Sequence, residues 1–273
     1  MIVCKFGGSS TTKKDALSNI LEISKNKNRK VFVFSAFGKI DKHDPKTTDL
    51  LIQFTSNKDP QEKNKILNIV KEKFNLLKKL TNVDLNLNKY FYEIEKSSDK
   101  DFIISRGEFL TAKIMAKFLK MKYIPAERLI CFENGKICEQ KTQKKLKTYL
   151  KKYERFCTGG FYGYDYALKK INLFNRGGGD TTGAILAALA KANLYEVYTD
   201  VSGVKAANPN IIQNPITIKK ISYKDMLKIS SCDGKVLHQS VCEILSGQNI
   251  KTKIINTFNP KNETTLIDDK KHI

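Results

Sequence analysis

The stretch Asn175-Arg176-Gly177-Gly178-Gly179-Asp180-Thr181-Thr182 decides how the chain is expected to fold, because it joins two different hydrophobic patterns. It follows a strand-like run at 170–174 and precedes an alanine-rich helical run at 183–190. A second strand-like run, at 194–198, comes directly after this helix. Strand, glycine loop, helix and strand in this order predict an α/β fold with a mainly parallel sheet.

The N-terminal residues have the same arrangement. Residues 2–6 form a strand-like run, Gly7-Gly8-Ser9-Ser10 follows, and the next residues have helical spacing. Residues 31–34 are all apolar, which predicts a central parallel strand covered on both faces. A Lys-rich helical pattern at 49–96 predicts a helical lobe, whereas the residues from 259 onward lose the apolar pattern and predict a short tail.

The composition limits the class of protein. Of the 273 residues, 41% are hydrophobic and 10% aromatic, which is enough apolar mass for a sizeable core. Lys and Arg number 49 against 28 Asp and Glu, which gives a net charge of +21. Such an excess is typical of nucleic-acid-binding proteins, but here Lys occurs together with much Asn and Ile, as AT-rich codons produce. We therefore interpret most of the charge as solvated surface and predict no nucleic-acid partner.

The sequence also bears on where the protein is found. No apolar run approaches the roughly 20 residues that span a bilayer. Met1 leads directly into the first strand-like run, without the pattern of a secretory signal. The six cysteines are far apart and lack metal-ligand spacing, which is typical of reduced thiols. We expect a cytoplasmic protein that starts at Met1, has no membrane partner and has no metal ligands of its own.

The two glycine loops are the candidate binding sites. Each can present backbone N–H groups to an anion, and the start of the following helix adds a positive dipole end. Lys5 precedes the first loop and Arg176 precedes the second, so phosphate and carboxylate groups are the expected ligands. The motifs of P-loop enzymes, dinucleotide-binding folds, protein kinases and serine hydrolases are absent from the sequence. Phosphoryl transfer by another architecture remains, since that reaction needs mainly positioning and charge neutralisation.

The chain resembles aspartate kinases, which are members of the amino acid kinase family. Five signatures in the right order and spacing carry the resemblance over essentially the whole chain: Lys5-Phe6-Gly7-Gly8-Ser9-Ser10, Arg176-Gly177-Gly178-Gly179-Asp180-Thr181-Thr182, Tyr198-Thr199-Asp200-Val201-Ser202-Gly203-Val204, Lys235-Val236-Leu237-His238 and Asn256-Thr257-Phe258-Asn259-Pro260. The resemblance implies a three-layer αβα amino acid kinase fold with a mainly parallel central sheet. It implies one kinase domain over 1–273, with a substrate lobe at about 1–170 and a nucleotide lobe at about 171–273.

The resemblance implies transfer of the γ-phosphoryl group of ATP to the side-chain carboxylate of L-aspartate, which gives 4-phospho-L-aspartate. This is the first step towards lysine or diaminopimelate, threonine and methionine. Lys5 would neutralise charge on the transferred group, and Asp180 would orient Lys5. No general base is required, because the attacking carboxylate is ionised at pH 7. Mg²⁺ would be held largely by ATP oxygens and water.

The remaining site residues follow from the same resemblance. Those expected to bind L-aspartate are Ser35, Thr48, Glu108 and Arg176. Those expected to bind ATP, besides Lys5, are Gly7, Gly8, Ser9, Thr199, Asp200 and Lys235. A purely structural interpretation also exists for several of them, since helix starts favour acidic residues such as Glu108 and Asp180, and Asp200 is typical of a turn.

The chain departs from the aspartate kinase pattern in several places. Gly179 replaces a usual serine, and Asn208-Pro209-Asn210 lacks an arginine associated with the nucleotide, so ATP affinity is more in doubt than reaction type. The sequence stops soon after the last signature, so we expect no ACT regulatory domain and no lysine or threonine feedback through this chain. A homodimer is expected by analogy alone. Two alternatives stay open: an enzyme of this fold acting on another acidic substrate, and a degenerate, non-catalytic binding protein.

Overall fold

A central sheet of eight strands organises the computed structural model, which describes residues 1–174, 177–208, 211–231 and 236–269. The strand order is β12-β14-β13-β9-β1-β2-β6-β3, and every neighbouring pair is parallel except β13 and β14. The strands span Ile2–Phe6 (β1), Arg29–Phe34 (β2), Lys122–Tyr123 (β3), Phe156–Gly159 (β6), Leu194–Thr199 (β9), Lys220–Ile221 (β12), Lys251–Asn256 (β13) and Thr265–Ile267 (β14). The predicted mainly parallel α/β fold is confirmed.

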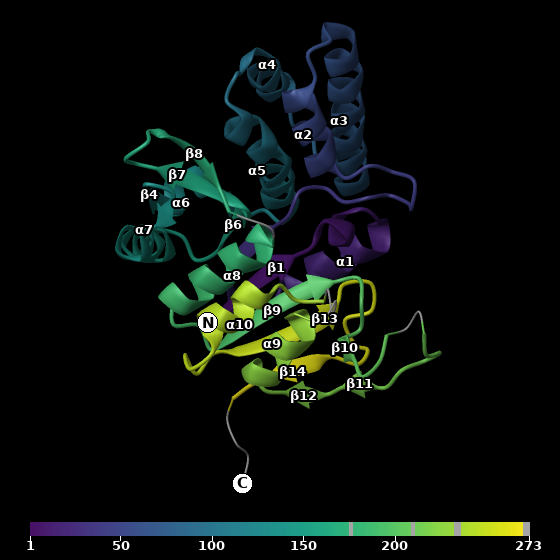
Figure 1. Cartoon of the computed structure of the whole chain (residues 1–273), viewed down its shortest axis with the longest axis vertical. Helices are drawn as coiled ribbons and strands as arrows, with labels where there is room; N and C mark the ends of the chain where they lie inside the picture. Colours follow the sequence, from purple (N-terminus) through teal and green to yellow (C-terminus); the bar gives the residue numbers. More distant parts are fainter. Residues whose placement is uncertain (175–176, 209–210, 232–235, 270–273) are drawn as a thin grey trace.

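Both faces of this sheet are covered by helices, so the fold has the three expected layers (Figure 1). One face packs against α1 (Lys14–Ile23) and α5 (Lys100–Phe118), and the other against α8 (Gly178–Leu189), which α10 (Gln239–Leu245) and α7 (Glu139–Lys152) contact in turn. Successive side chains of a strand point to opposite faces. Phe32 and Phe34 of β2 therefore belong to the first core and Val31 and Val33 to the second, and all four are fully buried.

The helical lobe expected from the Lys-rich pattern is confirmed. It consists of α2 (Thr47–Ser56), α3 (Pro60–Thr81), α4 (Asn88–Lys96) and the N-terminal part of α5, at the top of Figure 1. Asp59 and Asp99 cap α3 and α5 by accepting hydrogen bonds from backbone N–H groups of the first turn. The inner faces of these helices are mainly apolar, although Lys73 of α3 is buried.

Smaller elements complete the structure. A four-stranded sheet joins β5 (Lys136–Ile137), β4 (Cys131–Glu133), β7 (Tyr162–Asp165) and β8 (Lys170–Leu173). The strands β10 (Val204–Lys205) and β11 (Thr217–Ile218) form an antiparallel pair. The remaining helices are the 3-10 turn η1 (Gly8–Thr11), α6 (Ala126–Leu129) and α9 (Tyr223–Ser231).

The prediction of a short tail from residue 259 onward is wrong, because β14 lies inside the central sheet between β12 and β13. Its three residues have almost no periodic pattern, and their pairing with two neighbours supplies the stability instead. No helix in the described part of the chain is long and apolar enough to cross a membrane.

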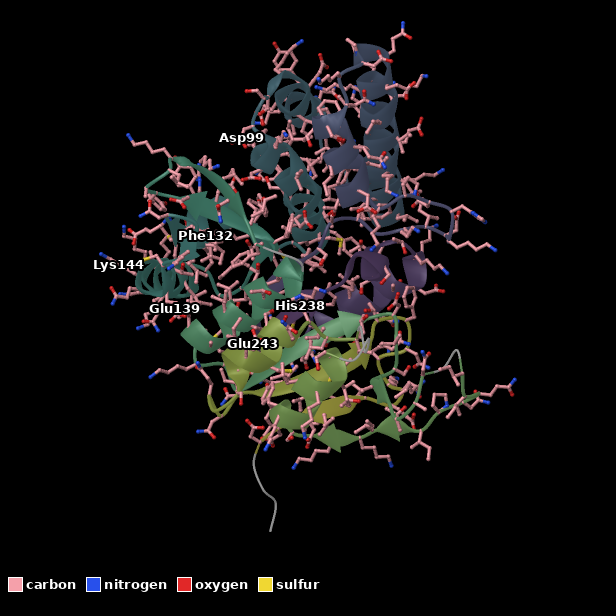
Figure 2. All side chains as sticks on the ribbon, viewed as in Figure 1. Asp99, Phe132, Glu139, Lys144, His238 and Glu243 are labelled. Carbon is pink, nitrogen blue, oxygen red and sulfur yellow. The ribbon has the colours of Figure 1, made fainter. Side chains whose placement is uncertain are left out.

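Much of the positive charge lies on exposed helix surfaces. Lys144 of α7 points away from the body of the molecule (Figure 2), and Lys65 and Lys79 of α3 are also exposed. This distribution agrees with the interpretation of the net charge as solvated surface.

Candidate functional site

A cavity of about 540 Å³ lies at the carboxyl ends of β1 and β2, beside the end of β9 and the start of α8. In the parallel register Phe6 is level with Phe34 on one side and Tyr198 on the other, so the loops after these three strands meet at one edge. Parallel sheets bind ligands at such edges. The cavity is lined by Lys5, Gly8, Ser9, Ser35, Ala36, Phe37, Gly38, Lys39, Lys46, Thr47, Thr48, Glu108, Phe161, Gly177, Gly178, Gly179, Asp180 and Asp200.

Most residues assigned from the sequence therefore come together. Gly7, directly after β1, and Thr199, the last residue of β9, lie next to the cavity in sequence but do not line it. Arg176 and Lys235 lie outside the described residues, as does Asn210. The cavity wall also includes Lys39, Lys46 and Phe161, which sequence reasoning did not assign.

Lys5 and Asp180 form an ion pair in the cavity, with 2.7 Å between Nζ and Oδ1. Val3 of β1 belongs to the core on the α8 side, and alternation along the strand sends Lys5 in the same direction. Asp180 lies in the first turn of α8 and meets it there. The two side chains are only 12% and 17% exposed, so the carboxylate holds the ammonium group in place and little of the charge is screened.

The first glycine loop packs directly against the loop after β2. The Gly38 N–H donates to the Gly8 carbonyl oxygen at 3.1 Å, and the Gly7 N–H donates to the Tyr198 carbonyl oxygen at 2.9 Å. A Cβ atom at Gly8 would lie 2.6 Å from the Ala36 carbonyl oxygen. Glycine is thus required at position 8 because two backbones touch there.

The second glycine loop begins α8. Gly177 caps the helix with a φ of 78°, in the left-handed region that favours glycine. A Cβ atom at Gly179 would lie 2.9 Å from Ser35 Oγ and 3.4 Å from Lys5 Cε, so this backbone closely approaches both side chains. The N-terminus of α8 consequently faces the cavity beside Lys5, an arrangement that binds anions.

His238, labelled in Figure 2, packs against this loop and does not line the cavity. A Cβ atom at Gly177 would lie 2.1 Å from His238 Cγ, so the imidazole ring packs on the glycine. The ring Nδ1 hydrogen-bonds Ser240 Oγ at 2.9 Å, and that hydroxyl hydrogen-bonds Thr181 Oγ1 at 2.6 Å. His238 belongs to the signature Lys235-Val236-Leu237-His238, from which no role for it follows. The structure places it against the α8 cap.

Glu108 lies on the opposite wall, in the middle of α5. The structural interpretation of Glu108 places it at a helix start, but α5 begins at Lys100, so an acidic cap does not explain Glu108. The side chain is 5% exposed, and within the described part of the chain its Oε2 has no hydrogen-bond partner. Burial raises the pKa of this carboxyl to about 8, although backbone hydrogen bonds and the charges of Arg106 and Lys5 act in the opposite direction. Such a group favours a cationic ligand.

The other predicted residues lie nearby. Ser35 follows β2, where its N–H donates to the Phe6 carbonyl oxygen at 3.1 Å. Thr48 is half-buried in the first turn of α2. Asp200 is exposed at the rim after β9, and one of its carboxylate oxygens accepts a hydrogen bond from Thr199 Oγ1 at 3.1 Å.

No group of three His, Cys, Asp or Glu side chains in the described ranges could hold a metal ion by itself. Of the carboxylates in the cavity, Asp180 is engaged by Lys5 and Asp200 is exposed at the rim. Mg²⁺ typically binds one or two carboxylates together with substrate phosphates and water. This donor set fits Mg²⁺ that arrives with a nucleotide.

Comparison with known proteins identifies related chains. The model of the amino acid kinase family matches residues 1–256. The aspartokinase of Rickettsia felis is 29% identical over 284 residues, which cover 99% of this chain and 61% of that protein. Aspartokinase 3 of Bacillus subtilis is 30% identical over 295 residues, which cover 99% of this chain and 64% of that protein. The crystal structure of Clostridium acetobutylicum aspartate kinase superposes with a TM-score of 0.90 and 32% identity, covering 100% of this chain and 64% of that one. The chain thus spans about three fifths of the length of these relatives.

Proposed function

The chain belongs to the amino acid kinase family, and from this premise we propose that it transfers the γ-phosphoryl group of ATP to the side-chain carboxylate of L-aspartate. The product is 4-phospho-L-aspartate. The similarity to aspartokinases over 99% of the chain supports the choice of substrate. The observation that carries the proposal is a single cavity with anion-binding groups on one wall and a buried carboxylate on the other.

The anion-binding wall suits the phosphoryl group. Lys5 is positioned by Asp180 to neutralise charge that develops on the transferred group. Gly8 and Ser9 line the cavity and offer backbone N–H groups to the phosphate oxygens, whereas Gly7, whose own N–H is bonded to the Tyr198 carbonyl oxygen, shapes the loop that presents them. Thr199, Asp200 and Lys235 bind the rest of the nucleotide. Mg²⁺, when bound with ATP, supplies further charge neutralisation at the phosphates.

The opposite wall suits the acceptor. The Glu108 carboxylate binds the α-ammonium group of L-aspartate, because it is buried and in need of a cation. Ser35 and Thr48 hydrogen-bond the substrate, and Arg176 binds a carboxylate with its bidentate fork. The attacking carboxylate is ionised at neutral pH, so these residues need only hold it in line with the phosphoryl group.

The division into lobes and the cellular setting complete the proposal. Residues 1–170 form the substrate lobe with Thr48 and Glu108, and residues 171–273 form the nucleotide lobe with Asp180 and Asp200. We further propose a cytoplasmic enzyme at the first step of the aspartate family of amino acids. A homodimer stays a prediction, which light scattering of the purified chain tests.

The direct experiment measures ADP release with ATP, Mg²⁺ and L-aspartate, with the acyl phosphate trapped as its hydroxamate. Turnover that requires L-aspartate supports the proposal. Turnover with L-glutamate, N-acetyl-L-glutamate or UMP in its place would assign another substrate. No turnover at millimolar ATP, from a chain whose circular dichroism spectrum shows it folded, would contradict catalysis.

A further inference from the structure

Residues 38–46, here called the basic loop, join β2 to α2 and form part of the cavity wall. They contain three lysines and a histidine, and of these Lys39 and Lys46 line the cavity. Neither lysine has a role in the function proposed above. The loop is nine residues long and mostly exposed, so chain entropy opposes any fixed position of these side chains unless contacts hold the loop.

Asp44 supplies such contacts. Its Oδ2 accepts a hydrogen bond from the Ile40 N–H at 2.7 Å, across the loop, and lies 2.5 Å from Lys73 Nζ on α3. Asp41 Oδ1 accepts hydrogen bonds from the N–H groups of His43 and Asp44, at 2.8 and 3.0 Å. The loop is thus closed on itself and tied to a long helix through one ion pair.

Burial makes this ion pair unusual on a lysine-rich surface. The side chain of Lys73 is 4% exposed and that of Asp44 is 14% exposed, whereas the Lys25–Glu22 and Lys65–Glu62 pairs are largely in solvent. A buried ammonium group persists only with a partner, so Asp44 and Lys73 depend on each other.

Hydrogen bonds also fix the two ends of the basic loop, next to Lys39 and Lys46. Gly38 touches the first glycine loop through its hydrogen bond to Gly8, which places the start of the loop beside the proposed phosphate site. At the other end, Thr47 Oγ1 donates to the Phe37 carbonyl oxygen at 2.6 Å, next to Lys46 and the first turn of α2. Lys39, which follows Gly38, therefore lies on the side of the proposed phosphate site, and Lys46, which precedes Thr47, lies on the side of the proposed acceptor site.

Lys39 and Lys46 add positive charge to the cavity that the proposed reactants require. Lys5 is paired with Asp180, whereas no ion pair in the part of the chain that the structure describes involves Lys39 or Lys46. Lys39 Nζ donates to the exposed Lys42 carbonyl oxygen at 3.2 Å, a neutral acceptor that leaves its charge unpaired. Reactants with a triphosphate and carboxylates bring several negative charges into this space, more than one paired lysine neutralises.

We propose that Lys39 and Lys46 are substrate-binding residues, Lys39 for the transferred phosphoryl group and Lys46 for a carboxylate of the acceptor, and that Asp44 and Lys73 position them. This inference rests on the proposed function. The inference adds to that function two substrate contacts made by the basic loop, and a positioning role for the buried Lys73 of the helical lobe.

Three matched variants test the contacts. Lys39→Met should weaken binding of a non-hydrolysable ATP analogue about tenfold, measured by calorimetry, and leave ADP binding unchanged, because ADP lacks the γ-phosphoryl group. Lys46→Met should raise the KM for L-aspartate about tenfold with little change in the KM for ATP. Lys42→Met, in the same loop but outside the cavity, should change neither value. If all three variants had the same affinity for the ATP analogue and the same KM for L-aspartate as the parent chain, the assignment of the two lysines would be wrong.

The positioning role has a readout that does not need catalysis. Trypsin cleaves after Lys39 and Lys42, so its rate at these bonds reports how firmly the loop is held. Asp44→Asn and Lys73→Met should each speed this cleavage at least tenfold and raise both KM values with a smaller effect on kcat. Lys79→Met, on the exposed side of α3, is the control. If circular dichroism shows that Lys73→Met does not fold, Asp44→Asn provides the test, because Asp44 is the more exposed member of the pair and asparagine has nearly the same shape.

The outcomes separate the two proposals. A parent chain that binds the ATP analogue but never phosphorylates L-aspartate contradicts the proposed function, while the calorimetry with Lys39→Met and the cleavage rates still decide the inference. An active parent chain whose Asp44→Asn and Lys73→Met variants keep parental cleavage rates and KM values contradicts the inference alone.

Discussion

The protonation of Glu108 predicts how the reaction depends on pH. Burial raises the pKa of its carboxyl to about 8, so in the free protein about one hundredth of the molecules carry the charge at pH 6, about one tenth at pH 7 and about half at pH 8. Only the ionised form attracts the α-ammonium group of L-aspartate. Because kcat/KM reports the free enzyme, its value for L-aspartate should rise about fiftyfold from pH 6 to pH 8.

The assay is initial-rate ADP release at saturating ATP over this pH range, with L-aspartate well below its KM. Both carboxylates of L-aspartate are ionised throughout, so the substrate itself adds no slope. Glu108→Gln is the matched control, since it keeps the shape of the side chain and removes the titration. Its kcat/KM should be low and flat with pH.

Two results would refute this reasoning. A flat profile for the parent chain would mean that Glu108 is already ionised at pH 6 or does not contact the substrate. An unchanged slope in Glu108→Gln would assign the titration to another group.

The same pKa shift predicts that the free energy of unfolding falls as pH rises, whereas kcat/KM rises. The folded form favours the neutral carboxyl, so the free protein loses stability as pH rises from about 4.5 through about 8. Glu108→Gln should therefore melt at a higher temperature than the parent chain at pH 8.5, and at a similar one at pH 4.

Three further predictions concern the site and the core beneath it. Lys5→Met should lower kcat at least thirtyfold, roughly 2 kcal/mol of transition-state stabilisation, with a smaller change in the KM for L-aspartate; an unchanged kcat would contradict its role. Arg29→Met removes the cation 2.6 Å from the buried carboxylate of Glu196 and should lower the free energy of unfolding by about 3 kcal/mol in urea denaturation, whereas a loss below about 1 kcal/mol would contradict the contribution of this ion pair. Gly8→Ala places a Cβ atom 2.6 Å from a backbone oxygen and should lower Tm by about 5 °C, while Gly7→Ala, with 3.5 Å of room, leaves Tm nearly unchanged; equal Tm values would contradict the loop contact.

Local patterns were sufficient to predict the framework of the fold. The apolar run at 31–34 predicted a strand covered on both faces, and Val31 to Phe34 are fully buried. The glycine loops predicted the turns between strands and helices, and the resemblance led to Lys5 and Asp180, which form an ion pair. Side-chain period and glycine position are short-range properties, so a sequence records them directly.

Local patterns failed where a residue owes its state to distant partners. The three residues of β14 were predicted to be a tail, but pairing with β12 and β13 makes them a strand. Glu108 was predicted near a helix start, but it lies inside α5, where packing buries it and shifts its pKa. Neither pairing partners nor burial is encoded in the neighbouring residues.

The sequence by itself determined the layered α/β architecture, the two glycine loops and the lysine beside the first of them. Only the tertiary structure decided which of the many lysines matter elsewhere. In the sequence Lys73 does not differ from the other lysines of α3, and folding alone brings it to Asp44 and buries it. Lys39 and Lys46 likewise become cavity residues because β1, β2 and α8 converge beside their loop. Burial and charge neutralisation depend on everything within a few ångströms, and most of those neighbours are remote in the chain.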